Sequence, residues 1–155
     1  MAKKKPNRQA RSAARLAAVQ ALYQMELTGA SWSKVRTEFE DHRFGMEVDG
    51  DVLVEADLKH FRKLLQGVVD HQPEIDKAVN ETLKAGWPLR RIDPILRALF
   101  RAGGYEMLAM DTPRNVIFNE YVEVAKAFFD GDEPKLANAV LEAIAKGLRP
   151  ESAVE

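Results

Sequence analysis

The sequence predicts an all-α domain of about seven helices, and three observations lead to this prediction. No stretch alternates apolar and polar residues with the period of two that is typical of strands. Apolar residues instead recur at helical spacing along most of the chain. The segment 92–110 is apolar nearly all round, which is typical of a helix in the middle of a bundle.

The length of 155 residues predicts a single domain. We expect residues 1–7 to form a basic disordered arm, residues 8–148 to form the helical domain, and residues 149–155 to form a disordered tail.

Two helices are predicted in the first third of the chain. Residues 8–28 are rich in Ala, Leu, Gln and Arg, which favour helices, and Gly29 follows where a C-terminal cap is expected. Residues 31–41 begin with serine, a preferred N-cap, and carry apolar side chains at helical spacing. The segment 43–54 holds two glycines among acidic residues and predicts a loop.

Two further helices are predicted around a proline. Residues 55–71 carry an amphipathic stripe, and residues 74–85 carry a second one. Pro73 ends or restarts the helix between them.

The apolar segment 92–110 predicts the central helix. Its single polar stripe is Asp93, Arg97 and Arg101, in which the first two residues are spaced to form a local ion pair. Gly103 and Gly104 lie inside this helix and cost about 1 kcal/mol each relative to alanine. They indicate either a close crossing by a neighbouring helix or a break into two shorter helices.

Two helices complete the prediction. Asp111 offers a capping side chain and Pro113 suits the first helical position, so a helix is expected from there to about residue 129. The segment 130–134 predicts a turn, and residues 135–146 carry the last apolar stripe.

The charge of the chain is unevenly distributed. Residues 1–25 carry +6 and no acid, whereas the remaining residues carry −7. Such a basic segment on an acidic body attracts a polyanion to one end of the molecule, or it serves only as a solubilising tail. The spacing of Arg8, Arg11 and Arg15 aligns them on one face at the start of the first helix.

Known catalytic and metal-binding patterns are absent from the sequence. The chain has no cysteine, and His42, His60 and His71 do not have metal-ligand spacing. No phosphate-binding glycine loop, nucleophile elbow or dinucleotide fingerprint occurs. We therefore expect a binding protein without catalytic activity, metal or cofactor. No segment predicts a signal peptide or a membrane span, so we expect a cytoplasmic location.

Four segments resemble the NusB family of bacterial transcription antitermination factors. The most specific is Pro113–Lys126, which is similar to the family pattern P-x-x-V-x-I-N-E-x-V-E-L-A-K with Phe118 where isoleucine is usual. The others are VQALYQMEL at 19–27, the segment 101–108, and ANAVLEAI at 137–144. The resemblance covers about residues 8–146.

This resemblance implies two packed helical subdomains and a role without catalysis. In the family, NusB pairs with NusE, which is also a small-subunit ribosomal protein, and the pair binds the boxA element of nascent RNA. With RNA polymerase and other Nus factors, the complex allows transcription to pass terminators, chiefly on ribosomal RNA operons.

The resemblance also implies site residues. The family's RNA-binding surface corresponds here to basic residues at the start of the chain and to residues around the turn before the last helix, with Lys126 extending the basic face. These residues are Lys4, Lys5, Arg8, Arg11, Arg15, Lys126, Asp132, Lys135 and Asn138. Leu136 replaces an aromatic residue that stacks on a base in some members, so tight RNA binding is expected to need NusE.

The implied partner-binding residues are Tyr23, Arg97 and Arg101. For Tyr23, a buried position in the core is an equal alternative to a partner contact. For Arg97, the equal alternative is an ordinary solvated ion pair. Leu96 replaces an acid that is common at the family's NusE contact, so the interface is expected to be shifted here.

Two other functions remain open from the sequence. One is a stand-alone relative of the NusB-like targeting domain of RNA methyltransferases. The other is a helical adaptor that binds only protein. Self-association is also open, because some family members are dimers and a dimer could cover the arginine face.

Overall fold

The computed structural model describes residues 8–41, 47–48, 51–52, 55–83 and 92–149. Within them the chain forms six helices and one short hairpin. The helices are α1 (Arg8–Thr28), α2 (Trp32–Phe39), α3 (Glu55–Leu83), α4 (Pro94–Ala109), α5 (Arg114–Phe128) and α6 (Glu133–Leu148). None of these helices combines the length and hydropathy needed to cross a membrane.

The difference between six helices and the predicted seven arises at Pro73. The two predicted segments lie within the single element α3 and meet at a kink, where His71 leaves helical geometry at φ −118° and ψ 15°, so the predicted interruption near Pro73 is present. A proline removes one backbone hydrogen bond and kinks a helix without having to end it. Val68 and Ile75, on either side of the kink, are both fully buried, so the core holds both halves.

A two-stranded hairpin lies in the segment that we predicted as a loop. Strands β1 (Glu47–Val48) and β2 (Asp51–Val52) pair antiparallel, with Glu47 opposite Val52. Each strand has only two residues, so the period-two signal was too short to recognise.

Several predicted helix ends are confirmed and others are corrected. Gly29 has φ 73° after α1, and the Ser31 side chain accepts a hydrogen bond from the Lys34 amide at the start of α2. Pro113 is the N-cap of α5 and not its first residue. The last helix starts at Glu133, within the segment that we predicted as a turn.

Asp93 has a further role besides its predicted interaction with Arg97. Its Oδ1 accepts a hydrogen bond from the Ile95 amide at 2.8 Å and caps α4. The hydrogen bond from Arg97 to Glu26 of α1 is the main cause of the raised pKa of Arg97, and the charge of Asp93, one turn away, raises that pKa further. A capping aspartate is favoured because it satisfies an amide that has no partner within the helix.

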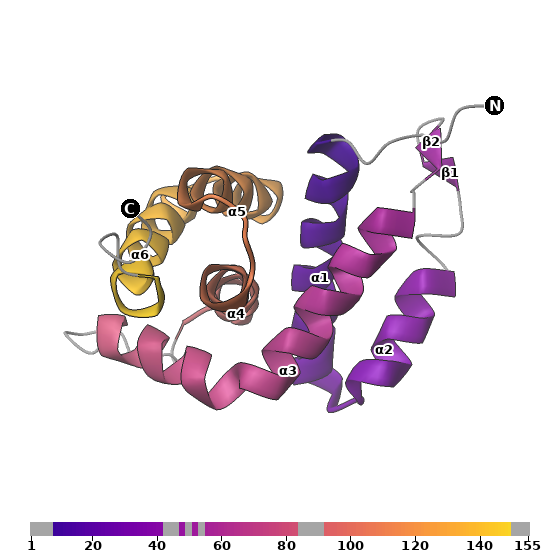
Figure 1. The fold of residues 1–155 in the computed structure, drawn as a ribbon, viewed down its shortest axis with the longest axis horizontal. Coiled ribbons are helices and arrows are strands. Elements are labelled where there is room, and N and C mark those ends of the chain that lie inside the picture. The colour runs from indigo at the N-terminus through magenta and orange to yellow at the C-terminus, as the bar shows by residue number, and fades with distance from the viewer. Residues whose placement is uncertain (1–7, 42–46, 49–50, 53–54, 84–91, 150–155) are drawn as a thin grey trace.

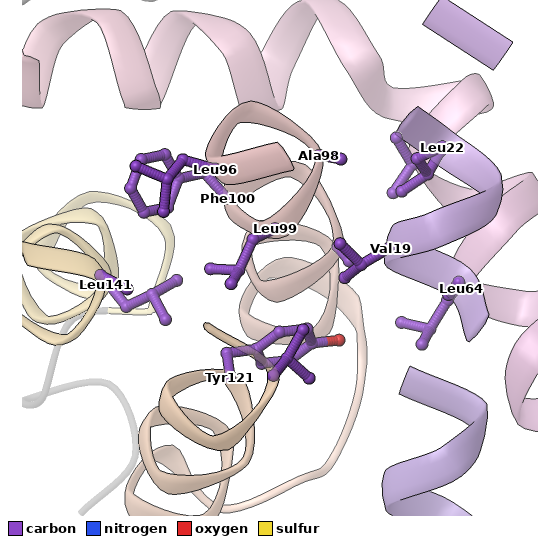
Figure 2. Packing of buried hydrophobic residues seen from close by; sticks show 14 of the residues in the cluster. Val19, Leu22, Leu64, Leu96, Ala98, Leu99, Phe100, Tyr121 and Leu141 are labelled. Carbon is purple, nitrogen blue, oxygen red and sulfur yellow. The ribbon is translucent and has the colours of Figure 1, made fainter. Parts of the chain in front are cut away.

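Helix α4 is central, as predicted. In Figure 1 it lies between α1 on one side and α5 and α6 on the other, with α3 passing beneath. Figure 2 shows Leu99 of α4 between Val19 of α1 and Leu141 of α6, with Tyr121 of α5 below it. All four of these side chains are fully buried.

The two glycines of α4 mark a close crossing and not a break, because the helix is continuous through them. A Cβ on Gly103 would lie 2.9 Å from Leu141 Cδ2, and one on Gly104 would lie 2.9 Å from Ile75 Cγ2. Helices α6 and α3 therefore approach α4 more closely than a larger residue would permit.

Gly67 of α3 allows a similar approach, and it yields a test. A Cβ there would lie 2.1 Å from the Tyr105 ring, so Gly67→Ala must displace that ring. We expect the free energy of unfolding, measured by urea denaturation, to fall by about 1–2 kcal/mol through lost packing.

Gly147→Ala is the matched control, because a Cβ at this position would meet nothing within 4 Å. It should stabilise the protein by up to about 1 kcal/mol through helix propensity. An equal gain from Gly67→Ala would contradict the close packing of Tyr105 on α3.

Candidate nucleic-acid interface

A buried ion network joins α1 to the rest of the domain. Arg15 is only 3% exposed, and its Nε and Nη2 donate to the two oxygens of Glu106 at 2.7 and 3.1 Å. Its Nη1 donates to Glu120 Oε1 at 2.9 Å. All three guanidinium nitrogens are therefore engaged by carboxylates of α4 and α5.

Three further side chains complete this network. Tyr121 donates its hydroxyl to Glu106 Oε1 at 2.8 Å, and His60 Nε2 of α3 lies 3.3 Å from the same oxygen. Ser12 donates to Glu120 Oε1. The network thus connects four helices through hydrogen bonds in the interior, where an unpaired charge would be costly.

The network holds Glu106 in its charged form. Burial raises the pKa of this carboxyl, but hydrogen bonds from His60 and Arg15 and the Arg15 charge outweigh burial and lower the pKa to about 2. Burial alone would lower the pKa of Arg15. The hydrogen bond to Glu106 and its charge outweigh burial, so the pKa of Arg15 is raised above its usual value. Burial beside Glu106 raises the pKa of Tyr121 well above its usual value.

A groove of about 780 Å³ opens beside the network. Its walls come from the start of α1, from α3, from the connection between α4 and α5, and from the first turns of α5. The lining residues are Arg11, Arg15, Lys63, Ala109, Met110, Asp111, Thr112, Pro113, Val116, Asn119 and Glu120.

Two cationic side chains of this groove are available to an anion. The Nε of Arg11 is buried and has no hydrogen-bond partner among the residues that the structure describes. Lys63 lines the groove from α3 and is exposed. An unpartnered guanidinium nitrogen is costly unless a ligand satisfies it, and phosphate oxygens suit it well.

The remaining lining suits a nucleotide base. Met110, Pro113 and Val116 provide apolar surface, and Val116 is 37% exposed. Asn119 is exposed and offers both a donor and an acceptor for a base edge. The groove therefore combines phosphate-binding and base-binding chemistry.

The structure separates the arginines that the sequence placed on one face. Arg11 reaches the groove, but Arg15 is buried and fully paired, so it is not a free phosphate ligand. Arg15 also lines the groove, so it has a structural role there, and its contact with RNA stays a prediction. Arg8 lies in the first turn of α1, and Lys4 and Lys5 lie outside the described residues.

The predicted residues around the last turn lie away from the groove. The groove includes the start of α5, whereas Asp132, Lys135 and Asn138 follow its end, and the two ends of a 15-residue helix lie roughly 20 Å apart. Lys135 and Asp132 are exposed, and Asn138 is partly exposed. Lys126 pairs with Glu123 at 3.0 Å on the surface.

The predicted partner-binding arginines share a second ion network at the surface. Arg97 Nε donates to Glu26 Oε1 at 2.7 Å, and Arg101 Nη1 donates to the same oxygen at 3.2 Å. Arg101 also forms two bonds to Asp76, at 2.9 and 3.0 Å. Leu27, beside Glu26 in α1, is 60% exposed, and Tyr23 is partly buried against the core.

Sequence reasoning missed several residues of the groove and its network. For Glu106 a signal was available, because an acid in a helix that is apolar nearly all round requires a buried partner. Lys63 and Thr112 gave no signal, since they join the groove only through tertiary packing. No group of three potential metal ligands occurs within the described ranges.

Comparison with known proteins identifies relatives over most of the chain. The NusB family model matches residues 12–146. The transcription antitermination protein NusB of Agrobacterium fabrum is 53% identical over 143 residues, which cover 92% of this chain and 87% of that protein.

Solved structures share the fold. T. maritima NusB is 25% identical, with a TM-score of 0.77 and 97% of each chain covered. NusB in the crystal structure of antitermination factors NusB and NusE in complex with dsRNA has a TM-score of 0.75. It is 24% identical, and the likeness covers 91% of this chain and 99% of that one.

The buried network predicts a large effect of Glu106→Gln. The substitution leaves the Arg15 charge partly uncompensated, so the free energy of unfolding at pH 7 should fall by about 3–5 kcal/mol in urea denaturation. The control is Glu123→Gln on α5, where the side chain is 61% exposed and the change should stay within about 0.5 kcal/mol. Similar effects of both variants would contradict the network.

The lowered pKa of Glu106 predicts an acid dependence. Its folded pKa of about 2 lies below the ordinary value of 4.5, so the charged carboxylate stabilises the folded protein above pH 4.5. That contribution, about 3 kcal/mol, is lost as the pH falls toward 2. The stability difference between wild type and Glu106→Gln should therefore narrow between pH 5 and pH 2.

Proposed function

The chain belongs to the NusB family, and from this premise we propose that it is a transcription antitermination factor that binds boxA-type RNA together with NusE. The observation that carries the RNA-binding part is the groove at the start of α1. There the Nε of Arg11 has no partner within the described part of the chain, and Lys63 is exposed in the same lining as the apolar residues.

The groove would supply both affinity and selectivity. Arg11 and Lys63 would bind phosphates, which gives salt-dependent affinity but little sequence information. Asn119 and the apolar wall would contact bases, and bases are accessible in this way only in a single strand. Single-stranded RNA with unstacked bases is thus the ligand class that fits the lining.

A second RNA contact is proposed at the start of α6. Asp132, Lys135 and Asn138 lie roughly 20 Å from the groove along α5, so RNA that reaches both must be extended. Lys126, on the last turns of α5, would add positive charge between them, and we propose that Arg8, Lys4 and Lys5 also contact RNA. Leu136 offers no ring for stacking, which favours RNA binding as a complex with NusE.

The NusE contact is proposed on the surface ion network with Tyr23, Arg97 and Arg101. Glu26 and Asp76 fix both guanidinium groups in position before a partner arrives. Leu27 adds an exposed apolar side chain to the same end of α1. Charged groups around an apolar contact are the usual composition of a transient protein interface.

The wider role follows the family. We propose that the complex acts with RNA polymerase and other Nus factors in the cytoplasm, chiefly on ribosomal RNA operons, and that the protein needs neither catalysis nor a cofactor. In the two-subdomain organisation, α1, α2 and the first half of α3 form one unit and the remaining helices form the other. The relatives match over most of their own length, which favours this role over a methyltransferase targeting domain.

Arg11→Gln tests the RNA groove. Affinity of the NusE-bound protein for a fluorescent boxA RNA, measured by anisotropy, should fall about tenfold at physiological salt. The slope of log affinity against log salt should decrease by about one, because one phosphate contact is lost. Lys77→Gln, on the exposed side of α3, is the control, and equal losses in both variants would contradict a localised site.

Leu27→Ser tests the partner surface. Since the side chain is 60% exposed, the free energy of unfolding should change by less than about 0.5 kcal/mol. Affinity for NusE, measured by calorimetry, should fall about tenfold, which corresponds to about 1.4 kcal/mol. Unchanged NusE affinity would exclude this end of α1 from the interface.

A further inference from the structure

Arg149 binds the backbone at the end of α4 and in the connection between α4 and α5. It is the C-cap of α6, although we predicted that the disordered tail begins there. Its Nε donates to Met107 O at 3.0 Å and its Nη2 donates to Glu106 O at 3.0 Å. The guanidinium also donates to Met110 O and Thr112 O.

These four acceptors are all backbone carbonyls at one place in the fold. Glu106, Met107 and Met110 belong to the C-terminal end of α4. The Glu106 carbonyl also accepts from the Met110 amide at 3.1 Å, and the carbonyls after it have no amide of a following helical turn to accept from. Thr112 lies in the turn that leads to α5. A positive charge at this end of a helix is also favoured by the helix dipole.

The same segment forms one wall of the groove. The continuous run 109–113 lines it, and α5 begins directly afterwards with Val116 and Asn119 in the lining. The Arg149 side chain is not among the lining residues. The guanidinium of Arg149 therefore fixes the backbone that forms this wall without lining the groove itself.

We propose that Arg149 is a positioning residue for RNA binding, an inference that rests on the proposed function of the groove. It contacts no RNA, because its Nε, Nη1 and Nη2 are all directed at carbonyls of the protein. By holding Met110 and Thr112, it sets the distance between the apolar wall and the phosphate-binding Arg11. The hydrogen bonds of Arg149 would thus couple the end of α6 to ligand binding at the start of α1.

Arginine is specifically suited to this task. Its planar fork presents several donors in fixed directions and can satisfy carbonyls on both sides of a turn. Lysine keeps the charge but offers a single ammonium group on a flexible stem. Arg149→Lys should therefore restore only part of what Arg149→Met loses.

The experiment compares Arg149→Met with the wild-type protein, each bound to NusE. Affinity for boxA RNA should fall about tenfold, while the slope of log affinity against log salt stays unchanged, since no phosphate contact is removed. NusE affinity should remain within twofold. Backbone amide exchange should accelerate in residues 110–112 and remain unchanged in α2. Lys146→Met, exposed on α6, is the matched control and should change none of these quantities.

Each other outcome would overturn the inference. Unchanged RNA affinity would show that the wall does not need Arg149, and a salt slope reduced by one would make Arg149 a direct phosphate ligand. Parallel loss of RNA and NusE affinity would indicate general destabilisation. If Arg149→Met does not fold, Arg149→Lys is read by the same criteria. Absence of RNA binding by the wild-type complex would refute the proposed function itself.

Discussion

The structure depends on the burial of Arg15 between Glu106 and Glu120. A guanidinium that is 3% exposed would strongly destabilise the fold without its carboxylate partners. With them, it fixes both the rotation and the depth of α1 against α4 and α5. Arg11, one turn earlier on the same face of α1, is consequently directed to the groove and not to bulk solvent. The burial of Arg15 thus determines where the Arg11 side chain points.

The candidate site therefore depends more on how the helices pack than on any local sequence motif. Arg11 comes from α1, Lys63 from α3 and Asn119 from α5, and each helix is fixed by contacts outside the groove. Arg15 holds the basic side, and Arg149 holds the opposite wall through backbone carbonyls. The close approach of helices at Gly103 and Gly104 keeps α4 central between these two anchors. A rigid groove loses less conformational entropy when a ligand binds, so ordering of the site opposes binding less.

Much of the fold could be predicted from local patterns, because helix formation is recorded in nearby residues. The bounds of α1, the cap at Gly29 and the central place of α4 all follow from periodicity and capping preferences. Pro73 predicted the interruption that α3 shows at His71, but the way in which the two halves meet could not be predicted, since packing on both sides of the kink decides it. The role of Arg15 was missed for the same reason: its acidic partners lie 91 and 105 residues away in the sequence. Similarly, local spacing predicted an interaction of Asp93 with Arg97 but could not show that Glu26, 71 residues away in the sequence, binds the same guanidinium.

In the proposed complex, RNA enters the groove between α1, α3 and the α4–α5 connection. The most direct test is an NMR titration of the labelled protein, bound to unlabelled NusE, with boxA RNA and with a scrambled RNA of equal length. If RNA enters this groove, boxA RNA will shift the backbone amides of Thr112, Val116 and Asn119 and the side-chain Nε–H of Arg11 more than the scrambled RNA does. Shifts confined to the start of α6, or identical shifts with both RNAs, would contradict it.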